Sequence, residues 1–477
     1  MSSTPNLLFL FTDEQRYDTL PHAQDRPGAF PPGSLRMPNL ERLGESACVF
    51  EEAYCTQPVC TPSRGSILTG LWPRTHGAYD NNIPLHPGAR TLPECLPAEM
   101  ADRYKTAYHG KWHLGNEIFA QHGFTEWAGI EDQYAQFYSP GRDPEAKCHY
   151  NQWLRKHGFK PDMRNGNFSR GQACSLPEPF TKPAFLAETA CEFLERNRTS
   201  PFIHYINFLE PHMPFFGPLT GLYEPEAAPL PPNLHDRPGE DMPVWREKAE
   251  RIAREGFEWY DLSRETGWRR MMAAYMGLNT LIDKYTGILL DKLEELGLAD
   301  NTIVVFTSDH GEMMGSHGLV GKQCMYQESI RVPLMIRLPG QTEPVRVRGP
   351  VSQVDLVPTL LELMGAPVPG HLQGQSRAGL LQEGKEARLE EDVVVTWNTS
   401  CEYNWENPRN AGEVATMEDV RTLVTPDGWR FSHYPESGNH ELFNLREDPL
   451  ERRNLAKEGA CLEIVRELSS RLAAFKW

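Results

Sequence analysis

Buried strands that end in charged residues constrain this fold more than any other feature of the sequence. Residues 302–308 form a β-branched, apolar run that leads directly into an Asp-His pair. Residues 6–12 form a second apolar run, which leads into an Asp-Glu pair. Short apolar runs of this kind are typical of strands buried on both faces, as in a parallel sheet between helices. The sequence therefore predicts a layered α/β/α domain with a mostly parallel central sheet.

Two further runs have the same arrangement. Residues 105–109 lead into Lys111 and His113, and residues 201–209 lead into His212. In open α/β sheets, ligands bind beyond the carboxyl ends of the strands. We therefore expect the side chains that follow all of these runs to meet at one edge of a single sheet.

The pattern of the sequence changes near residue 375. Short strand-like segments follow, joined by tight turns, and the chain ends in an amphipathic helix. We predict a catalytic domain over residues 1–374 and a smaller α+β domain, with an antiparallel sheet and a terminal helix, over residues 375–477. Two segments of the first domain, about 131–190 and about 216–268, are rich in Pro, Trp, Tyr and charge, which predicts surface loops that shape a substrate pocket.

Charge and cysteine content exclude several classes of protein. The chain has 48 Lys and Arg against 65 Asp and Glu, a net charge of −17, which argues against a nucleic-acid or anionic-membrane partner. The apolar run at residues 7–11 is too short for a membrane span or a signal-peptide core, so we expect a cytoplasmic protein. Ten cysteines without a C-x-x-C pair indicate neither a disulfide scaffold nor a zinc site. Nothing in the sequence predicts an oligomeric state.

The most informative motif is the string Cys60-Thr-Pro-Ser-Arg64, which is followed by Gly65 and by Leu68-Thr-Gly70. This C-x-P-S-R string resembles the signature of the formylglycine-dependent sulfatases of the alkaline phosphatase superfamily. The resemblance runs from Asn6 to about Leu455, with the motifs in the family's order, and is strongest to iduronate-2-sulfatase-like and bacterial carbohydrate and aryl sulfatases. It implies an alkaline-phosphatase-like fold.

The resemblance also implies a nucleophile. In this family the cysteine that matches Cys60 is oxidised to formylglycine by the formylglycine-generating enzyme, and the aldehyde is hydrated to a geminal diol. One hydroxyl attacks sulfur, and the other then expels sulfate and restores the aldehyde, which divides a difficult displacement into two steps. Arg64 stands where its charge would hold the hydrate or a neighbouring carboxylate.

A metal site follows from the same comparison. Asp13, Glu14, Asp309 and His310 match the family positions that bind one divalent ion, usually calcium, and oxygen ligands suit such a hard cation. The nitrogen ligand leaves manganese as an alternative. Glu14 departs from the family's usual second Asp, and its extra methylene leaves open whether it binds the ion directly.

Four more residues match family positions that contact the sulfate or the formylglycine: Lys111, His113, His212 and Lys322. Hydrolysis of a sulfate ester also needs a proton for the leaving oxygen. Either His212 or Lys322 would supply that proton, and the sequence does not choose between them.

These residues predict a sulfuric ester hydrolase that cleaves the sulfate monoester of a small molecule or carbohydrate to an alcohol and inorganic sulfate. The first alternative is a phosphonate monoester or phosphodiester hydrolase of the same superfamily, because the transferred groups have similar size and charge. The second is an inactive binding or scaffold protein with the same fold. Such a protein would usually lack the nucleophile or a ligand, whereas this chain departs from the pattern only at Glu14.

Overall fold

The computed structural model describes residues 4–23, 30–240, 242–382, 386–397 and 419–475. Within these ranges, a ten-stranded sheet has the order β10-β9-β2-β8-β6-β1-β5-β3-β4, and β7 pairs with β2. Only β7 and β8 run against the other described strands of this sheet. The strands are β1 (Asn6–Asp13), β2 (Cys48–Tyr54), β3 (Lys105–Gly110), β4 (Glu126–Gly129), β5 (Phe202–Pro211), β6 (Thr302–Ser308), β7 (Arg331–Val332), β8 (Leu334–Arg337), β9 (Val345–Ser352) and β10 (Glu386–Arg388).

Both faces of this sheet are buried. Leu7, Phe9 and Phe11 of β1 belong to one hydrophobic core, and Leu8 and Leu10 belong to a second core on the opposite face. Successive side chains of a strand point to opposite faces, so an uninterrupted apolar strand fills two cores at once. Each fully buried Leu or Phe side chain contributes about 1.5–3 kcal/mol to folding. The predicted layered α/β fold is therefore confirmed.

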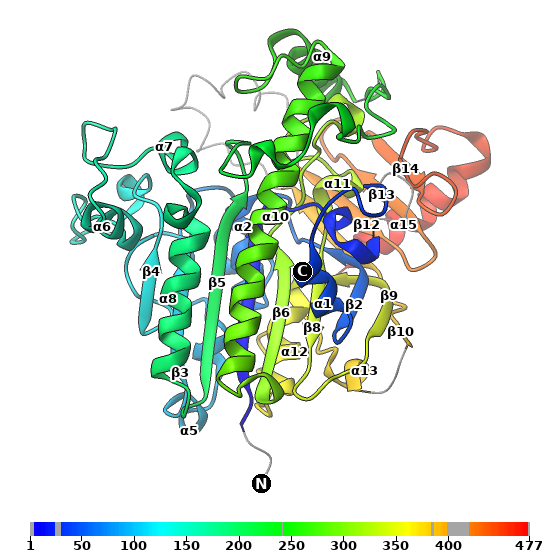
Figure 1. Cartoon of the computed structure of the whole chain (residues 1–477). Helices are drawn as coiled ribbons and strands as arrows, with labels where there is room; N and C mark the ends of the chain where they lie inside the picture. The colour runs from blue at the N-terminus through cyan, green and yellow to red at the C-terminus, as the bar shows by residue number, and fades with distance from the viewer. Residues whose placement is uncertain (1–3, 24–29, 241, 383–385, 398–418, 476–477) are drawn as a thin grey trace.

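Helices cover the two faces. Helices α8 and α10 lie together against β5 on one face, where Figure 1 shows them in front of the sheet. Apolar side chains of α2 and α12 fill the core on the other face. The helices are α1 (Pro38–Gly44), α2 (Cys60–Thr69), α3 (Pro73–His76), α4 (Leu92–Cys95), α5 (Ala98–Ala101), α6 (His149–Lys156), α7 (Arg170–Ser175), α8 (Lys182–Arg196), α9 (Pro243–Glu255), α10 (Glu265–Glu295), α11 (Gln327–Ile330), α12 (Leu356–Leu363), α13 (Ala378–Gln382) and α15 (Leu462–Ala474).

A second, smaller sheet forms near the C-terminal end. Its order is β11-β12-β13-β14, and all of its pairs are antiparallel. Leu468 and Leu472 of α15 pack against one face, in a core with Phe431 and Leu442. Side chains of the other face, such as Val395, join the core of the large sheet. The strands are β11 (Val393–Trp397), β12 (Val420–Val424), β13 (Trp429–His433) and β14 (His440–Asn444).

The structure departs from the predicted organisation at two points. Strand β10 pairs with β9, so the large sheet continues past residue 374 to Arg388. The segments 131–190 and 216–268, predicted as surface loops, also contain α6, α7 and α9 and the first residues of α8 and α10. Helix α6 buries Tyr150 and Leu154 on one face, which is the pattern of an amphipathic helix.

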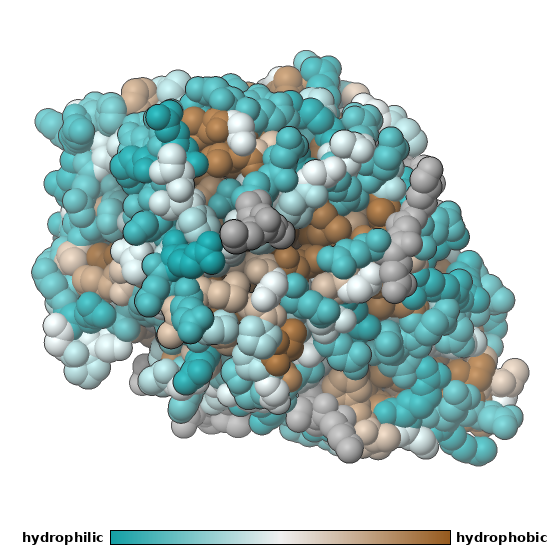
Figure 2. Space-filling model, turned by 90° about the horizontal axis from the view of Figure 1, so that it is seen from below, coloured by the Kyte–Doolittle hydropathy of each residue, from teal (hydrophilic) through white to brown (hydrophobic). Residues whose placement is uncertain are grey.

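The surface seen from the side on which the N-terminus lies is mostly hydrophilic, with apolar side chains in scattered patches (Figure 2). Among the helices of the described ranges, none has the length and apolar character that a membrane crossing requires.

Candidate active site

The topology brings the charged strand ends together. Strand β1 pairs in parallel with β5 on one side and β6 on the other, and Thr12 lies beside Ser308. Strand β3 pairs with the far side of β5. Their carboxyl ends therefore lie at one edge, where they present Asp13, Lys111, His212 and Asp309.

Cys60 is the first residue of α2 and points into this edge. Its Sγ lies 3.6 Å from Oδ1 of Asp13 and 3.3 Å from Nε2 of His310. Every residue of α2 is buried. The hydroxyl of Ser63 donates to the backbone carbonyl of Asp309, so the helix that carries Cys60 is tied to the end of β6.

Arg64 lies one turn further along α2 and is fully buried. Its Nη2 donates to Oδ2 of Asp13 at 2.6 Å, and its Nε lies 2.9 Å from Oδ2 of Asp309. Its Nη1 donates to Oδ1 of Asn207 at 2.6 Å and to the carbonyl of Lys111 at 2.8 Å. The guanidinium thus joins the ends of β1, β3, β5 and β6, and charge-assisted contacts of this kind fix the geometry of the site.

Asp13 lies at the centre of these contacts. Its Oδ2 accepts from Nζ of Lys111 at 2.5 Å as well as from Arg64. Burial raises the pKa of Asp13, but Lys111 and Arg64 outweigh burial and hold this pKa well below its usual value. Asp13 is therefore a carboxylate, with negative charge available for a cation.

Glu14 lies beside Asp13 in a left-handed backbone conformation, with φ of 70°. Its Oε1 accepts from Nζ of Lys322 at 2.7 Å, and its Oε2 lies 3.5 Å from Nε2 of His212. Burial raises the pKa of Glu14 to about 8, and the nearby carboxylate of Glu312 adds to that rise, although Lys322 opposes it. Such a raised pKa marks a buried acid that lacks enough positive charge around it.

His310 has the tautomer of a metal ligand. Its Nδ1 lies 2.9 Å from the carbonyl of Gly311, and since a carbonyl can only accept, Nδ1 carries the proton. Nε2 then presents a lone pair toward Asp13, Cys60 and Asp309. Metal-binding histidines commonly donate their other N–H to a backbone carbonyl in this way.

The donor set fits a divalent cation. Ligand atoms of Asp13, Cys60, Asp309 and His310 lie within 4.8 Å of one another, and Asp13, Glu14 and His212 form a second such group. Among the described side chains, Oε2 of Glu14 is buried without a hydrogen-bond partner. Buried polar atoms normally have a hydrogen-bond partner, so this carboxylate oxygen indicates room for a positively charged ligand.

His113 is held by three residues that the motifs did not predict. Its Nε2 lies 3.0 Å from Oδ1 of Asn82, and its ring lies 4.5 Å from the ring of Tyr134. The carboxylate of Glu117 accepts from the backbone N–H of Trp112 and of His113, at 2.8 and 2.6 Å. Burial and the charge of Lys111 lower the pKa of His113 well below its usual value, so this ring is neutral.

The first predicted insertion reaches the site. Tyr134, which packs on His113, accepts from Nη2 of Arg170 at 3.1 Å. Arg170 forms two bonds to the carboxylate of Glu131, both 2.7 Å long. In the second insertion, Trp268 is buried and packs inside the fold, whereas Trp259 is 57% exposed.

The structure thus brings together all the residues that the sequence predicted for the site: Asp13, Glu14, Cys60, Arg64, Lys111, His113, His212, Asp309, His310 and Lys322. The motifs missed Asn82, Glu117, Tyr134 and Asn207. Asn207 left a signal in the sequence, because it is a polar residue between the apolar Ile206 and Phe208 of β5.

Comparisons with known proteins identify the family of the chain. Residues 5–366 match the family model described as Sulfatase, and residues 315–476 match the model described as N-sulphoglucosamine sulphohydrolase, C-terminal. The chain is 29% identical to the multifunctional alkaline phosphatase superfamily protein PehA of Trinickia caryophylli, over 99% of this chain and 95% of that protein. It is 30% identical to an ulvan-active sulfatase of Formosa agariphila, over 79% of this chain and 65% of that protein's length.

Solved structures agree on the fold. A protein in complex with its substrate D-glucosamine-2-N,6-O-disulfate has a TM-score of 0.74, at 21% identity over 99% of this chain and 97% of that one. The phosphonate monoester hydrolase of Agrobacterium radiobacter has a TM-score of 0.77, at 21% identity over 98% of this chain and 95% of that one. The fold is that of the alkaline phosphatase superfamily. The chain belongs to the sulfatase family of that superfamily and is a sulfatase enzyme.

Proposed function

We propose that this sulfatase hydrolyses a sulfate monoester of a small molecule or carbohydrate, with formylglycine derived from Cys60 as the nucleophile. The observation that carries the proposal is the position of Cys60, whose Sγ lies within 3.6 Å of both Asp13 and His310. Formylglycine at this position supplies a hydrated aldehyde, which offers one hydroxyl for attack and a second for release of sulfate. The overall reaction consumes one water and yields one alcohol, one sulfate ion and one proton.

The environment of Cys60 disfavours a mechanism that uses its thiol directly. Burial raises the pKa of Cys60 to about 12, and the neighbouring carboxylate of Asp13 adds to that rise. A thiolate is the reactive form of cysteine, and this pKa leaves very little of it near neutral pH. Conversion to formylglycine removes this obstacle, because a hydrated aldehyde needs no thiolate.

Asp13, Glu14, Asp309 and His310 would hold one divalent ion. Such an ion would neutralise the sulfate and polarise its sulfur-oxygen bonds. The three carboxylates favour calcium, and the imidazole of His310 keeps manganese as the alternative. Lys111, His113, His212 and Lys322 lie around the same space and would bind the sulfate oxygens.

Mass spectrometry of the peptide that contains Cys60 tests the nucleophile. After expression with a formylglycine-generating enzyme, we expect its mass to fall by about 18 Da, the difference between thiol and aldehyde. The Cys60→Ser variant should show no conversion by the same enzyme and lose sulfate release, whereas Cys55→Ser, which changes a buried cysteine five residues earlier, should convert normally. An unmodified Cys60 beside a fully converted control sulfatase would refute the proposal.

Metal analysis of the purified enzyme tests the second part. We expect about one calcium or manganese ion per chain, and less in the Asp13→Asn variant, because a ligand is lost. Protein that binds no divalent ion, even after dialysis against either metal, would instead favour a non-catalytic binding protein.

A phosphonate monoester or phosphodiester hydrolase is the alternative. The multifunctional relative and the phosphonate monoester hydrolase of similar fold both favour it. One purified preparation should therefore be assayed on an aryl sulfate and on an aryl phosphonate with the same leaving group. We expect the larger kcat/KM on the sulfate, and the reverse order would select the alternative.

A further inference from the structure

A cavity separate from the active site lies between the edge of the large sheet and the small sheet. Its volume is about 330 Å³, and its walls come from β2, β7, β9 and β10 on one side and from the turns beside β13 and β14 on the other. None of the residues predicted for the active site lines it. Small-molecule sites usually measure about 300–1,000 Å³, so this cavity has room for a molecule of monosaccharide size.

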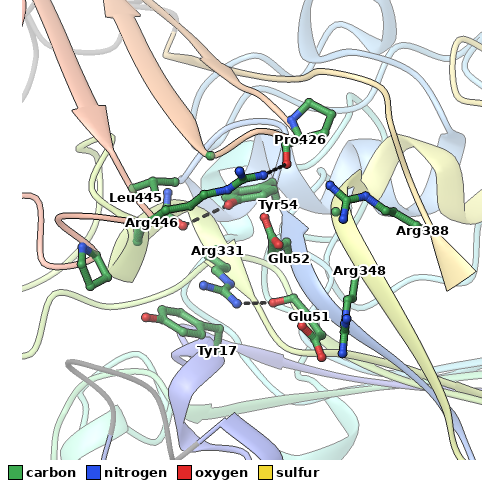
Figure 3. A pocket seen from close by; sticks show the side chains of 14 residues that line it. Tyr17, Glu51, Glu52, Tyr54, Arg331, Arg348, Arg388, Pro426, Leu445 and Arg446 are labelled. Carbon is green, nitrogen blue, oxygen red and sulfur yellow. Dashed lines mark hydrogen bonds between the residues drawn. The ribbon is translucent and has the colours of Figure 1, made fainter. Parts of the chain in front are cut away.

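The lining of the cavity is rich in arginine. Figure 3 shows Arg446 on the side of the small sheet, Arg348 and Arg388 on the opposite side, and Arg331 between them. The charged side chains of the lining are these four arginines and two glutamates, so their formal charge is 4 − 2 = +2. The whole chain carries −17, which makes this a local positive region on an acidic protein.

The ion partners of the outer arginines are exposed. Arg348 lies 3.7 Å from Glu386, and Arg388 lies 2.5 Å from Glu390; all of these side chains are more than half exposed. Exposed ion pairs contribute little free energy, so these guanidiniums can exchange their partners for a ligand at small cost. Arg446 is also exposed, and one of its Nη atoms donates to the carbonyl of Pro426 at 3.0 Å.

Two donors deeper in the cavity lack partners. Nε of Arg331 and Nε2 of Gln327 are buried and have no hydrogen-bond partner among the described residues. The guanidinium of Arg331 is held in place by the ring of Tyr17, 4.2 Å away, and by the carbonyl of Glu51. Leaving a buried donor unsatisfied costs about 1–3 kcal/mol, and an oxygen-rich ligand would recover that cost.

We propose that this cavity binds a small anionic molecule of monosaccharide size that carries a sulfate, phosphate or carboxylate group. The forked N–H donors of arginine match the paired oxygens of all three groups. Arg331 and Gln327 hold the oxyanion at the inner end, and Arg348 and Arg446 close on it from the two sheets. The site does not depend on the activity proposed for Cys60.

Calorimetric titration of the Cys60→Ala protein, which prevents turnover, tests the site. The probes are glucose 6-sulfate, glucose 6-phosphate, glucuronate, inorganic sulfate and neutral glucose. We expect the anionic sugars to bind more tightly than inorganic sulfate, and glucose not to bind. The double variant Arg348→Gln, Arg446→Gln should raise the Kd of the anionic sugars at least tenfold, whereas Arg42→Gln should leave it unchanged.

Arg42 is a suitable control because it is an arginine of similar exposure to Arg348, 43% against 54%, and neither it nor its ion partner Asp291 lines the cavity. Sugar binding at the active site would survive the double variant and appear as a second event. Equal affinity in the double variant and the parent, or binding to none of the anionic sugars, would overturn the proposal. Tighter binding of inorganic sulfate than of any sugar would mean that the cavity recognises only the anion, and this result would also overturn the proposal.

Discussion

At the scale of single residues, His212 and Lys322 differ in the proton that each can offer. Nδ1 of His212 donates to the carbonyl of Met213 at 2.6 Å, so its Nε2, which faces Glu14, carries a lone pair. Burial lowers the pKa of Lys322, but the carboxylate of Glu14, whose Oε1 lies 2.7 Å from Nζ, helps to raise this pKa above its usual value, so Lys322 carries its proton. Of the two, Lys322 is the residue that holds a proton, and we predict that it protonates the leaving oxygen.

The roles of Lys322 and His212 can be distinguished by how the hydrolysis rate of each variant depends on the leaving group. We expect Lys322→Met to slow hydrolysis of a phenyl or alkyl sulfate by about 10²–10⁴-fold and that of a nitrophenyl sulfate much less, because a good leaving group needs no acid. His212→Asn should slow both substrates to a similar extent. Steady-state rates over a series of aryl sulfates measure this difference, and a stronger leaving-group dependence in His212→Asn would reverse the assignment.

The residues that could be predicted from the sequence are those that belong to short local motifs. Cys60 and Arg64 lie within one string, and Asp309 and His310 follow one strand. Asn207 could not be predicted as the acceptor for Arg64, because the two are 143 residues apart in the chain and meet only when β5 lies beside β1. The supporting contacts of the site are thus a product of topology.

At the scale of elements, the position of α2 depends on the close approach of Gly65 to His76. A Cβ at Gly65 would lie 2.4 Å from Cε1 of the His76 ring, which is itself held by hydrogen bonds. We expect Gly65→Ala to reduce the free energy of unfolding by about 1–3 kcal/mol and to lower kcat, because α2 carries Cys60. Denaturant unfolding and sulfate release measure the two effects.

Gly379→Ala is the matched control for this change. Gly379 also lies in a helix, but no atom lies within 4 Å of the added Cβ, so the variant should gain up to about 1 kcal/mol from helix propensity. Equal stability of Gly65→Ala and the parent would mean that the His76 ring moves aside freely, against the packing seen here.

His76 also gives α2 a dependence on pH. Its Nδ1 accepts from the N–H of Ala78 at 3.2 Å, and its Nε2 lies 3.1 Å from the carbonyl of Pro62, which requires a neutral ring with the proton on Nε2. Burial lowers the pKa of His76 to about 3 from 6.5. Between these pH values the unfolded chain binds a proton at His76 and the folded chain does not, so acid favours unfolding.

We therefore expect stability to fall as pH decreases from about 6.5 toward 3, with His76 contributing a slope of at most about 1.4 kcal/mol per pH unit. Denaturant titrations at several pH values should show that His76→Gln reduces this slope, while His371→Gln, at an exposed position, serves as the control. An unchanged slope in His76→Gln would contradict the assignment of a neutral buried ring.

Elements with strong local patterns were predicted correctly, and those that depend on pairing were not. Strands β1 and β6 are continuous apolar runs, and both form as expected. The short strands β7 and β8, which run antiparallel in a mostly parallel sheet, carry no pattern that distinguishes their direction. Strand β10 has three residues and exists only through its pairing with β9.

At the scale of the whole molecule, the two sheets share one core and one buried ionic network. Arg430 of β13 is fully buried and bonds to the carboxylates of Glu441 and Glu451. Glu451 in turn accepts from the backbone N–H of Gln327 at 2.7 Å, where α11 leads into β7 of the large sheet. Buried ion pairs and a hydrogen bond thus connect the small sheet to the large one.

Because of these buried contacts between the two sheets, we predict that the protein unfolds as one unit. Arg430→Met leaves Glu441 and Glu451 buried without their partner, which should cost about 3–5 kcal/mol. The exposed pair of Arg42 and Asp291 provides the control, since Arg42→Met should cost less than about 1 kcal/mol. Scanning calorimetry should show a single transition in the parent and in Arg430→Met, shifted to lower temperature in the variant. Because Val395 and Phe443 lie in the same core as β1, loss of the small sheet also uncovers the large one. A separate early transition in Arg430→Met would show instead that the small sheet melts alone, and that the shared core contributes little to cooperativity.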